Sequence, residues 1–301
     1  MSAARIVVIR PGALGDAILT LPVLQSLAAA GARVTAVGHP VFRLAVECGL
    51  AAEHVPFDDA RLLDLFAEGG SCPLFAGFDL AIAYTRRADP LLVANLGRSG
   101  VTAVVAWPAH PEPGLHVTDH LLGALGAAGV EAGERRPTLP PRREWLDAAR
   151  AWLDERGVGR GFVAVHPGSG GRAKRWPVER FAELAGRLGR PVVWLLGPAE
   201  AQDDEARGLG SQVGAVAADV PLPTLVGLLA SCLAYVGNDS GVSHLAAAIG
   251  APTLALFGPT DPATWAPRGE RVAVLGSPHS GGFESVSVEQ ALRALGPWLR
   301  A

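Results

Sequence analysis

The residues best suited to chemistry lie in the segment Gly237-Asn-Asp-Ser-Gly-Val-Ser-His244, between an apolar run and a helical pattern rich in alanine. A strand that turns into a helix here aims unpaired backbone N–H groups and the positive end of the helix dipole at one point. Such a point suits a phosphate group. Ser240 is a good N-cap residue, and Gly241 has no Cβ to block a ligand. The alternative is an ordinary capped helix that binds nothing, and this segment alone does not decide between the two.

A second candidate segment is His166-Pro-Gly-Ser-Gly-Gly-Arg-Ala-Lys-Arg-Trp-Pro177, which follows a predicted strand at residues 162–165. Its glycines, its serine and its cations make a flexible loop that is rich in hydrogen-bond donors. A solvated turn is the ordinary interpretation of such a loop. Both segments, however, should leave the same carboxyl edge of one parallel sheet. Their convergence favours a diphosphate site over two unrelated turns.

Asp16 is the candidate general base. It ends the loop Arg10-Pro-Gly-Ala-Leu-Gly-Asp16, which joins a predicted strand at residues 5–9 to a predicted helix. One interpretation makes Asp16 a simple N-cap. The other places it among ligand-binding groups, because open α/β sheets bind ligands at the carboxyl ends of their strands. The loop lacks the Gly-x-Gly-x-x-Gly pattern and the second strand runs into Gly38-His39-Pro40, so NAD is not the predicted ligand.

The elements that must position these residues alternate between strand and helix, which predicts an α/β protein whose parallel sheets carry helices on both faces. The pattern breaks at residues 137–141 and then restarts. We therefore expect two Rossmann-like, doubly wound domains, residues 1–150 and 151–301, hinged near residues 138–158 and facing each other across a ligand cleft. The last helix belongs to the second domain or packs back on the first. The predicted strands are residues 5–9, 34–37, 80–84, 102–106, 162–165, 192–196, 234–236, 253–257 and 272–275, and the predicted helices are residues 16–30, 41–48, 142–156, 178–188, 200–209, 222–231, 240–249 and 286–299.

Composition excludes several classes of protein. A hydrophobic content of 49% with only 18% charged residues argues against disorder, and a net charge of −3 gives no basic footprint for a nucleic acid. Three widely spaced cysteines fit neither a disulfide framework nor a zinc cluster, and indicate buried thiols in a reducing cytoplasm. The N-terminus shows no secretory signal. The uncharged residues 220–237 contain Pro221 and Pro223, which favours a short helix and a buried strand over a membrane span.

Four short motifs occur in order along almost the whole chain. They are Gly15-Asp16 with Pro22, His166-Pro-Gly-Ser with Lys174-Arg-Trp-Pro177, Asp239-Ser-Gly-Val-Ser-His244, and Phe257-Gly-Pro-Thr-Asp-Pro262 with Trp265-Ala-Pro. With these motifs the chain resembles glycosyltransferase family 9, the lipopolysaccharide heptosyltransferase-like enzymes. The resemblance implies a GT-B fold, with two Rossmann-like domains that bind the acceptor on the N-terminal one and the nucleotide-sugar on the C-terminal one. It implies inverting transfer without a metal or another cofactor, which agrees with the lack of an Asp-x-Asp motif.

The resemblance also implies roles for individual residues. Asp16 matches the catalytic base of the family, and Lys174 matches the lysine that meets the donor phosphates. Glu200 is a looser match to an acidic residue that contacts the nucleotide. Ala13 stands where many members have serine, and Gly170 stands where some have a second hydroxyl. The other donor-binding residues that the resemblance implies are Ser169, Gly170, Asp239, Ser240, Gly241 and His244.

The predicted function is therefore transfer of a sugar from a nucleoside diphosphate to a hydroxyl of a lipopolysaccharide-core or other surface-glycan acceptor. ADP-heptose is the favoured donor, and the expected location is the cytoplasm, with at most peripheral contact with the inner face of the membrane. Two alternatives stay open. The first is a sugar-nucleotide epimerase or hydrolase of the same fold, and the second is a nucleotide-sugar-binding module without catalysis.

Two further sets of residues have ordinary explanations that we prefer. His116 and His120 are four residues apart and could share one helix face as metal ligands, but no third ligand is apparent, so the start of a surface helix is favoured. Arg86, Arg87 and Arg98 lie near predicted strand ends in the first domain. They could bind an acidic acceptor, although solvated arginines are the default.

Overall fold

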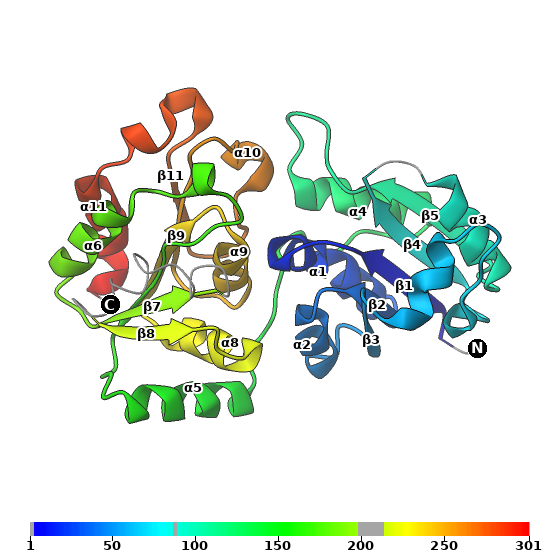
Figure 1. Ribbon diagram of the computed structural model, residues 1–301, viewed down its shortest axis with the longest axis horizontal. Coiled ribbons are helices and arrows are strands. Elements are labelled where there is room, and N and C mark those ends of the chain that lie inside the picture. The colour runs from blue at the N-terminus through cyan, green and yellow to red at the C-terminus, as the bar shows by residue number, and fades with distance from the viewer. Residues whose placement is uncertain (1–2, 87–88, 198–213, 301) are drawn as a thin grey trace. The chain divides into compact units, whose positions relative to one another are not determined.

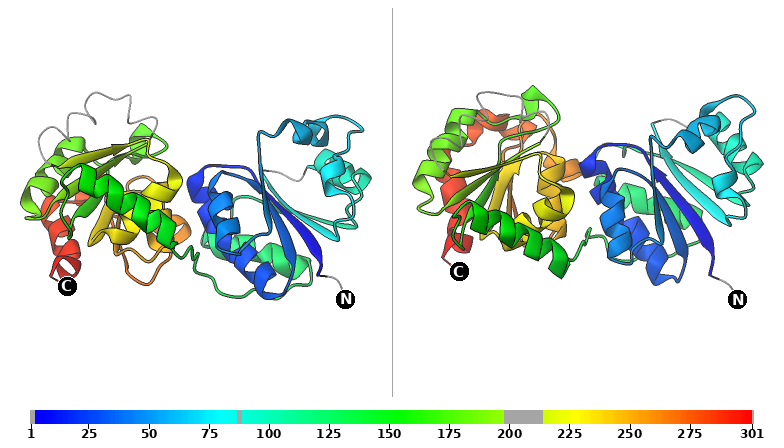
Figure 2. Two further views of the ribbon diagram at one scale, coloured as in Figure 1. Left: turned by 90° about the horizontal axis from the view of Figure 1, so that it is seen from below. Right: turned by 60° about the horizontal axis from the view of Figure 1, so that its bottom comes forward.

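The computed structural model describes residues 3–86, 89–197 and 214–300. The chain divides into two compact units, Met1–Pro137 and Thr138–Ala301. Each unit is a parallel sheet with helices on both faces, which confirms the predicted fold class (Figure 1; Figure 2). The division falls earlier than the predicted boundary at residue 150, because helix α5 (Arg143–Glu155) packs against helix α8 (Leu222–Ser231) of the second unit.

The sheet of the first unit has five strands in the order β3-β2-β1-β4-β5, and every pair is parallel. The chain runs outward from β1 through β2 to β3, and then returns to the other side of β1 with β4. The strand order therefore reverses between β1 and β4, and such switch points are where open α/β sheets bind ligands. The strands are β1 (Arg5–Arg10), β2 (Arg33–Gly38), β3 (Glu53–Pro56), β4 (Leu80–Thr85) and β5 (Ala103–Pro108).

Helices cover both faces of this sheet. On one face, α1 (Leu14–Ala29) contacts both α2 (Val41–Glu47) and α4 (Val117–Ala127). On the other, α3 (Pro90–Arg98) packs with the short 3₁₀ helices η1 (Ala60–Phe66) and η2 (Pro73–Phe75). The buried residues of that second face are apolar and fix the strands against these helices; they include Val7, Ile9, Val37, Leu65, Phe75, Phe78, Leu92 and Leu96.

The sheet of the second unit has six parallel strands in the order β11-β10-β9-β6-β7-β8. Here β6 leads outward to β7 and β8, and the chain then returns to the other side of β6 with β9. The switch point of this sheet therefore lies between β6 and β9. The strands are β6 (Val163–His166), β7 (Val192–Leu196), β8 (Ala215–Ala218), β9 (Ala234–Asn238), β10 (Thr253–Leu256) and β11 (Val272–Leu275).

Helices α5, α8 and α9 (Gly241–Ala248) lie on one side of this sheet. Helices α6 (Val178–Arg187) and α11 (Val288–Leu299) cover the other side. The short helix α10 (Pro262–Trp265) follows β10. The last helix, α11, packs on the core of the second unit, where Val288, Ala291 and Leu295 are buried beside Trp176 and Phe181.

Most predicted elements are confirmed within two residues of their ends. The helix predicted at residues 16–30 begins earlier, at Leu14. The helix predicted at residues 200–209 lies outside the described residues. The two short strands β3 and β8, and the helices α3 and α10, were not predicted as elements, and only the start of α4 was predicted. None of the described helices is long and apolar enough to cross a membrane, and residues 220–237 form α8 and β9 instead.

Candidate functional site

The carboxyl ends of β6 and β9 are joined by the buried amide of Asn238. Its Nδ2 donates to the carbonyl oxygen of Pro167 at 2.7 Å, and its Oδ1 accepts from the backbone N–H of Trp176 at 2.9 Å. One side chain at the end of β9 therefore holds both the start and the end of the loop that follows β6. The Trp176 ring, buried against Phe181, anchors the far end of this loop in the core. The two segments that the sequence singled out thus meet at the switch point.

Asp239 is the polar centre of this junction. Its Oδ2 accepts from Lys174 Nζ at 2.9 Å and from Thr260 Oγ1 at 2.7 Å. Its carbonyl oxygen accepts from Ser169 Oγ at 2.8 Å. The carboxylate is 8% exposed and the lysine 39% exposed, so the protein surrounds the acid while the ammonium reaches solvent. Asp239 is therefore in direct contact with two other predicted site residues, Ser169 and Lys174.

Ser240 occupies the N-cap position of α9, as predicted, but its side chain does not cap the helix. Its Oγ instead lies 3.4 Å from Ser243 Oγ, which donates to the carbonyl oxygen of Asn238 and lies 2.9 Å from Tyr235 OH. The N–H groups of Ser243 and His244 turn back to the Ser240 carbonyl. Those of Gly241 and Val242 precede them and point out of the N-terminal end of α9. This end of the helix suits an anion.

The remaining donor-side predictions fare differently. Gly170 lies in the loop that follows β6 and is exposed, and as a glycine it has no side chain that could contact a ligand. His244 is buried in the first turn of α9. Glu200 lies outside the described residues. His166 has a structural role, because its Nδ1 lies 2.8 Å from the carbonyl oxygen of Leu195 on the neighbouring strand.

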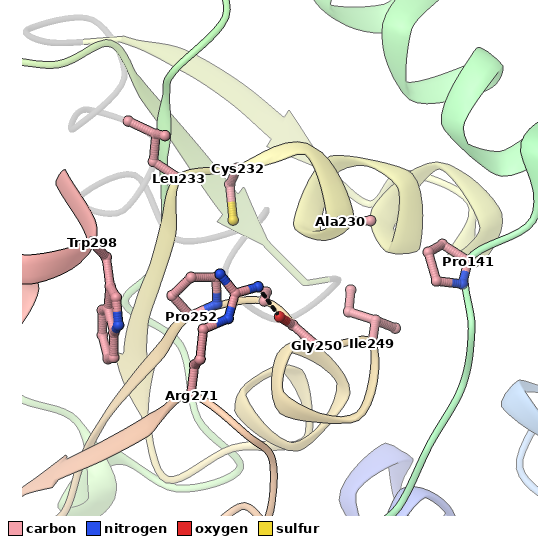
Figure 3. A pocket seen from close by; sticks show the side chains of 10 residues that line it. Pro141, Ala230, Cys232, Leu233, Ile249, Gly250, Pro252, Arg271 and Trp298 are labelled. Carbon is pink, nitrogen blue, oxygen red and sulfur yellow. Dashed lines mark hydrogen bonds between the residues drawn. The ribbon is translucent and has the colours of Figure 1, made fainter. Parts of the chain in front are cut away.

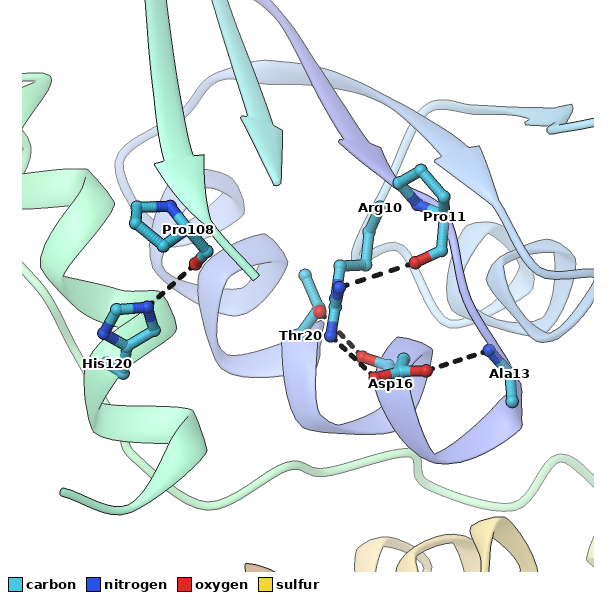
Figure 4. Close-up of polar contacts among 7 residues, drawn as sticks. All are labelled: Arg10, Pro11, Ala13, Asp16, Thr20, Pro108 and His120. Atoms are coloured by element: carbon cyan, nitrogen blue, oxygen red, sulfur yellow. Dashed lines mark hydrogen bonds and ion pairs between the residues drawn. The ribbon is translucent and has the colours of Figure 1, made fainter. Parts of the chain in front are cut away.

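Asp16 lies at the carboxyl end of β1 in the first unit, in the third position of α1 rather than at its N-cap (Figure 4). Ala13 takes the N-cap position, and its backbone N–H donates to Asp16 Oδ2 at 3.0 Å. The interpretation of Asp16 as the N-cap is therefore wrong: the helix begins at Leu14, so Asp16 lies three residues after the N-cap. From the third position, the carboxylate reaches back over the start of the helix, as the acidic residue of a capping box does.

Arg10 is the second partner of Asp16, and this contact was not predicted. Its Nη2 donates to Asp16 Oδ1 at 2.7 Å. Arg10 is the last residue of β1 and is only 3% exposed, whereas Asp16 is 30% exposed. Burial lowers the pKa of the Arg10 guanidinium, and the Asp16 carboxylate opposes that shift. In the second unit, the hydrogen bond from Thr260 to Asp239 was likewise not predicted, although Thr260 lies in one of the family motifs.

His116 and His120 each have a structural partner in the first unit. His116 caps α4 by accepting from the backbone N–H of Thr118, and His120 Nε2 lies 2.8 Å from the carbonyl oxygen of Pro108 (Figure 4). Over the described part of the chain, no group of three His, Cys, Asp or Glu side chains could hold a metal ion. Arg98 donates to Asn95 Oδ1 at 2.6 Å, which explains it as a structural residue. Arg86 is exposed at the end of β4, and Arg87 lies outside the described residues.

A pocket of about 350 Å³ lies at the opposite, amino edge of the second sheet, where β9, β10 and β11 begin (Figure 3). Its charged residue, Arg271, donates to the carbonyl oxygen of Gly250 at 2.6 Å and so caps the C-terminal end of α9. Burial raises the pKa of the Cys232 thiol to about 12, so this side chain is no nucleophile at neutral pH. The pocket therefore offers none of the chemistry found at the carboxyl edge.

The two carboxyl edges differ in what they present to a ligand. The second unit offers the Lys174 ammonium, the hydroxyls of Ser240 and Thr260 and the N–H groups at the start of α9, all of which stabilise developing negative charge. The first unit offers the Asp16 carboxylate, which can accept a proton. A cation and a helix N-terminus on one unit and a carboxylate on the other are the groups that a transfer between a diphosphate and a hydroxyl requires.

Comparisons with known proteins identify the family of this chain. The model of glycosyltransferase family 9 (heptosyltransferase) matches residues 110–293, which is more than half of the chain. Lipopolysaccharide heptosyltransferase 3 of Escherichia coli is 31% identical over 166 residues, which make up 52% of this chain and 48% of that protein. The chain thus spans about half the length of the curated relatives it matches.

Two solved structures are similar over nearly the whole chain. The glycosyl transferase family 9 from Veillonella parvula is 23% identical with a TM-score of 0.80, and the match covers 99% of this chain and 97% of that one. The ADP-heptose lps heptosyltransferase II of E. coli is 20% identical with a TM-score of 0.78, and the match covers 98% of each chain. These likenesses establish the fold and confirm the predicted GT-B class.

Proposed function

The chain belongs to glycosyltransferase family 9, and from that premise we propose that it transfers a sugar from a nucleoside diphosphate to a hydroxyl of a glycan acceptor. The observation that supports this most is the group around Asp239. Lys174, Ser169 and Thr260 meet there at the switch point of the second sheet, beside the N-terminal end of α9. We assign the diphosphate of the donor to this edge, and the acceptor to the edge of the first sheet that carries Asp16.

ADP-heptose is the donor that we propose. An E. coli heptosyltransferase with a TM-score of 0.71 to this chain was solved with ADP, and again, at a TM-score of 0.69, with ADP-2-deoxy-2-fluoro heptose. The proposed acceptor is a lipopolysaccharide-core or similar surface glycan, since the curated relatives are named as lipopolysaccharide heptosyltransferases. We place the reaction on the cytoplasmic side of the membrane, where nucleotide-activated sugars are used.

The proposed reaction is a single displacement. The acceptor hydroxyl oxygen forms a bond to the anomeric carbon, while the bond from that carbon to the diphosphate oxygen breaks. The hydroxyl proton passes to Asp16, and the diphosphate leaves with the bonding electron pair. Attack on the face opposite the leaving group inverts the anomeric centre. The Lys174 ammonium and the N–H groups of Gly241 and Val242 stabilise the charge on the diphosphate, a role that needs no metal ion and is worth about 10²–10³ in rate for each donor.

The replacement Asp16→Asn tests the proposal. The amide keeps the shape of the side chain but cannot take the proton, and its one oxygen accepts from either Arg10 or Ala13, which donate to different oxygens of Asp16. We expect transfer to fall about 10²–10⁴-fold while the affinity for ADP-heptose, measured by calorimetry, stays the same. Asp79→Asn is the matched control, because Asp79 accepts from the backbone N–H of Arg5 at the amino edge of the same sheet.

A donor-consumption assay separates the transferase from the epimerase or hydrolase and from the binding module. The purified protein is incubated with ADP-heptose alone and then with an added acceptor, and the loss of ADP-heptose is followed. A transferase consumes the donor only when the acceptor is present. An epimerase or hydrolase consumes it without an acceptor, and a binding module never does. Full transfer by Asp16→Asn would exclude Asp16 as the base.

A further inference from the structure

We infer that Arg10 is a positioning residue, which holds the Asp16 carboxylate in the orientation from which it accepts the proton of the acceptor. This inference rests on the function proposed above. Arg10 ends β1, and its guanidinium lies behind Asp16 as seen from solvent, with 3% of the side chain exposed against 30% for Asp16. Its Nη2 donates to Asp16 Oδ1 at 2.7 Å, and its Nη1 lies 3.4 Å from the carbonyl oxygen of Pro11 (Figure 4).

The surroundings of Asp16 leave its carboxylate little freedom. Oδ1 is held by Arg10 and Oδ2 by the N–H of Ala13, so a rotation of the carboxylate breaks at least one of these bonds. Gly12 faces Oδ2 so closely that a Cβ there would lie 2.5 Å from it. The carboxylate is thus clamped from two sides, and each oxygen keeps a further lone pair for another hydrogen bond.

Stability alone does not account for Arg10. Removing a guanidinium from water is costly unless all its N–H groups are bonded, and the buried Nε of Arg10 has no hydrogen-bond partner among the described residues. Asp16, being partly exposed, needs no buried cation to remain solvated. Tyr84, the buried neighbour of Arg10, donates its hydroxyl hydrogen to the carbonyl oxygen of Leu121 and not to Arg10. We therefore assign the buried charge of Arg10 to the orientation of the Asp16 carboxylate, to which it donates a hydrogen bond.

Two substitutions test the role of Arg10. Arg10→Met keeps most of the buried volume and removes the charge, and replacing a buried ion pair by an apolar side chain is often neutral or stabilising. We expect the melting temperature to be unchanged or higher and the KM for ADP-heptose to stay within about threefold. We expect kcat to fall about 10²-fold, as when a reacting group is misplaced by about 1 Å. Arg10→Lys restores one donor to Oδ1 and should recover at least about tenfold of that loss.

A double variant separates positioning from any other effect. In the Asp16→Asn background there is no base left to position, so Arg10→Met should lower the remaining rate no further. Arg61→Met is the matched control, since Arg61 pairs with Asp59 at 2.6 Å on the surface of the same unit.

Each outcome is decisive. The positioning role is overturned if Arg10→Met keeps the wild-type kcat, if it lowers the rate further in the Asp16→Asn background, or if it unfolds well below the wild-type temperature, because Arg10 would then serve stability. Absence of transfer by the wild-type protein would instead refute the proposed function itself. An inactive Arg10→Met with an active Arg10→Lys and an unchanged KM supports the inference.

Discussion

Replacing Asp239 by asparagine tests which partner of the Lys174–Asp239 pair serves the donor. The ammonium of Lys174 lies 2.9 Å from the Asp239 carboxylate, so a diphosphate that binds Lys174 approaches a buried negative charge. Asparagine has the same shape, and its Oδ1 still accepts from Lys174 and from Thr260. The substitution therefore removes the charge of Asp239 and keeps the hydrogen bonds of the loop.

The size of the effect follows from Coulomb's law. For a phosphate charge about 6 Å from the carboxylate, the repulsion is about 0.7 kcal/mol in water and about 2.8 kcal/mol at an effective dielectric constant of about 20. Asp239 is 8% exposed and Lys174 39% exposed, so the site lies between these limits. A gain of about 1.4 kcal/mol corresponds to tenfold tighter binding. We therefore expect Asp239→Asn to bind ADP about tenfold more tightly than the wild-type protein.

Calorimetry with ADP at constant ionic strength measures this change, because ADP carries the diphosphate and lacks the sugar. Thr260→Val is the first control, since it removes a hydrogen bond from Asp239 and leaves the charge in place. Glu289→Gln is the second, since Glu289 pairs with Arg187 at 2.7 Å on the surface of the same unit. Weaker binding of ADP by Asp239→Asn at an unchanged melting temperature would refute this reasoning and would mean that the carboxylate itself attracts the ligand.

Two further substitutions address the same junction. Lys174→Met should lower transfer about 10²–10³-fold and weaken ADP binding, because the exposed cation is lost while Asp239 keeps the Thr260 hydroxyl; an unchanged rate in steady-state assays would remove Lys174 from the mechanism. Gly237→Ala should destabilise the protein by about 1–3 kcal/mol in urea unfolding, because a Cβ there would lie 2.2 Å from the buried hydroxyl of Tyr235; a loss below about 0.5 kcal/mol would show that the ring moves aside.

The fold was predictable because its strands are short apolar runs that end at glycine, proline or polar residues. The strands that escaped prediction, β3 and β8, have four residues each and lie at sheet edges, where few of their side chains are buried. An edge strand lacks the continuous apolar run that marks a buried parallel strand. For helix α4 only the start was predicted, and His116 does cap this helix.

The candidate site was predictable only in part, for a different reason. Turns that follow strands are visible in a sequence, so the loops ending at Asp16, Lys174 and Asp239 were found. Contacts between loops are not visible. Neither the bond from Thr260 to Asp239 nor the one from Arg10 to Asp16 follows from local pattern. Asp16 lies at the third position of α1 because the helix begins at Leu14, although Ala13 is a poor N-cap residue.

Both units contain a cation–carboxylate pair, but the buried partner is the cation in the first unit and the carboxylate in the second. Each holds a cation–carboxylate pair at the carboxyl edge of its sheet, and in each pair one partner is buried and fixed while the other reaches solvent. In the first unit Arg10 is buried and Asp16 is partly exposed, whereas in the second Asp239 is buried and Lys174 is partly exposed. Because the exposed partner is the one that a ligand meets, the first unit presents a proton acceptor and the second presents a cation. This asymmetry in the burial of the four side chains supports the proposed placement of the acceptor hydroxyl at one edge and of the diphosphate at the other.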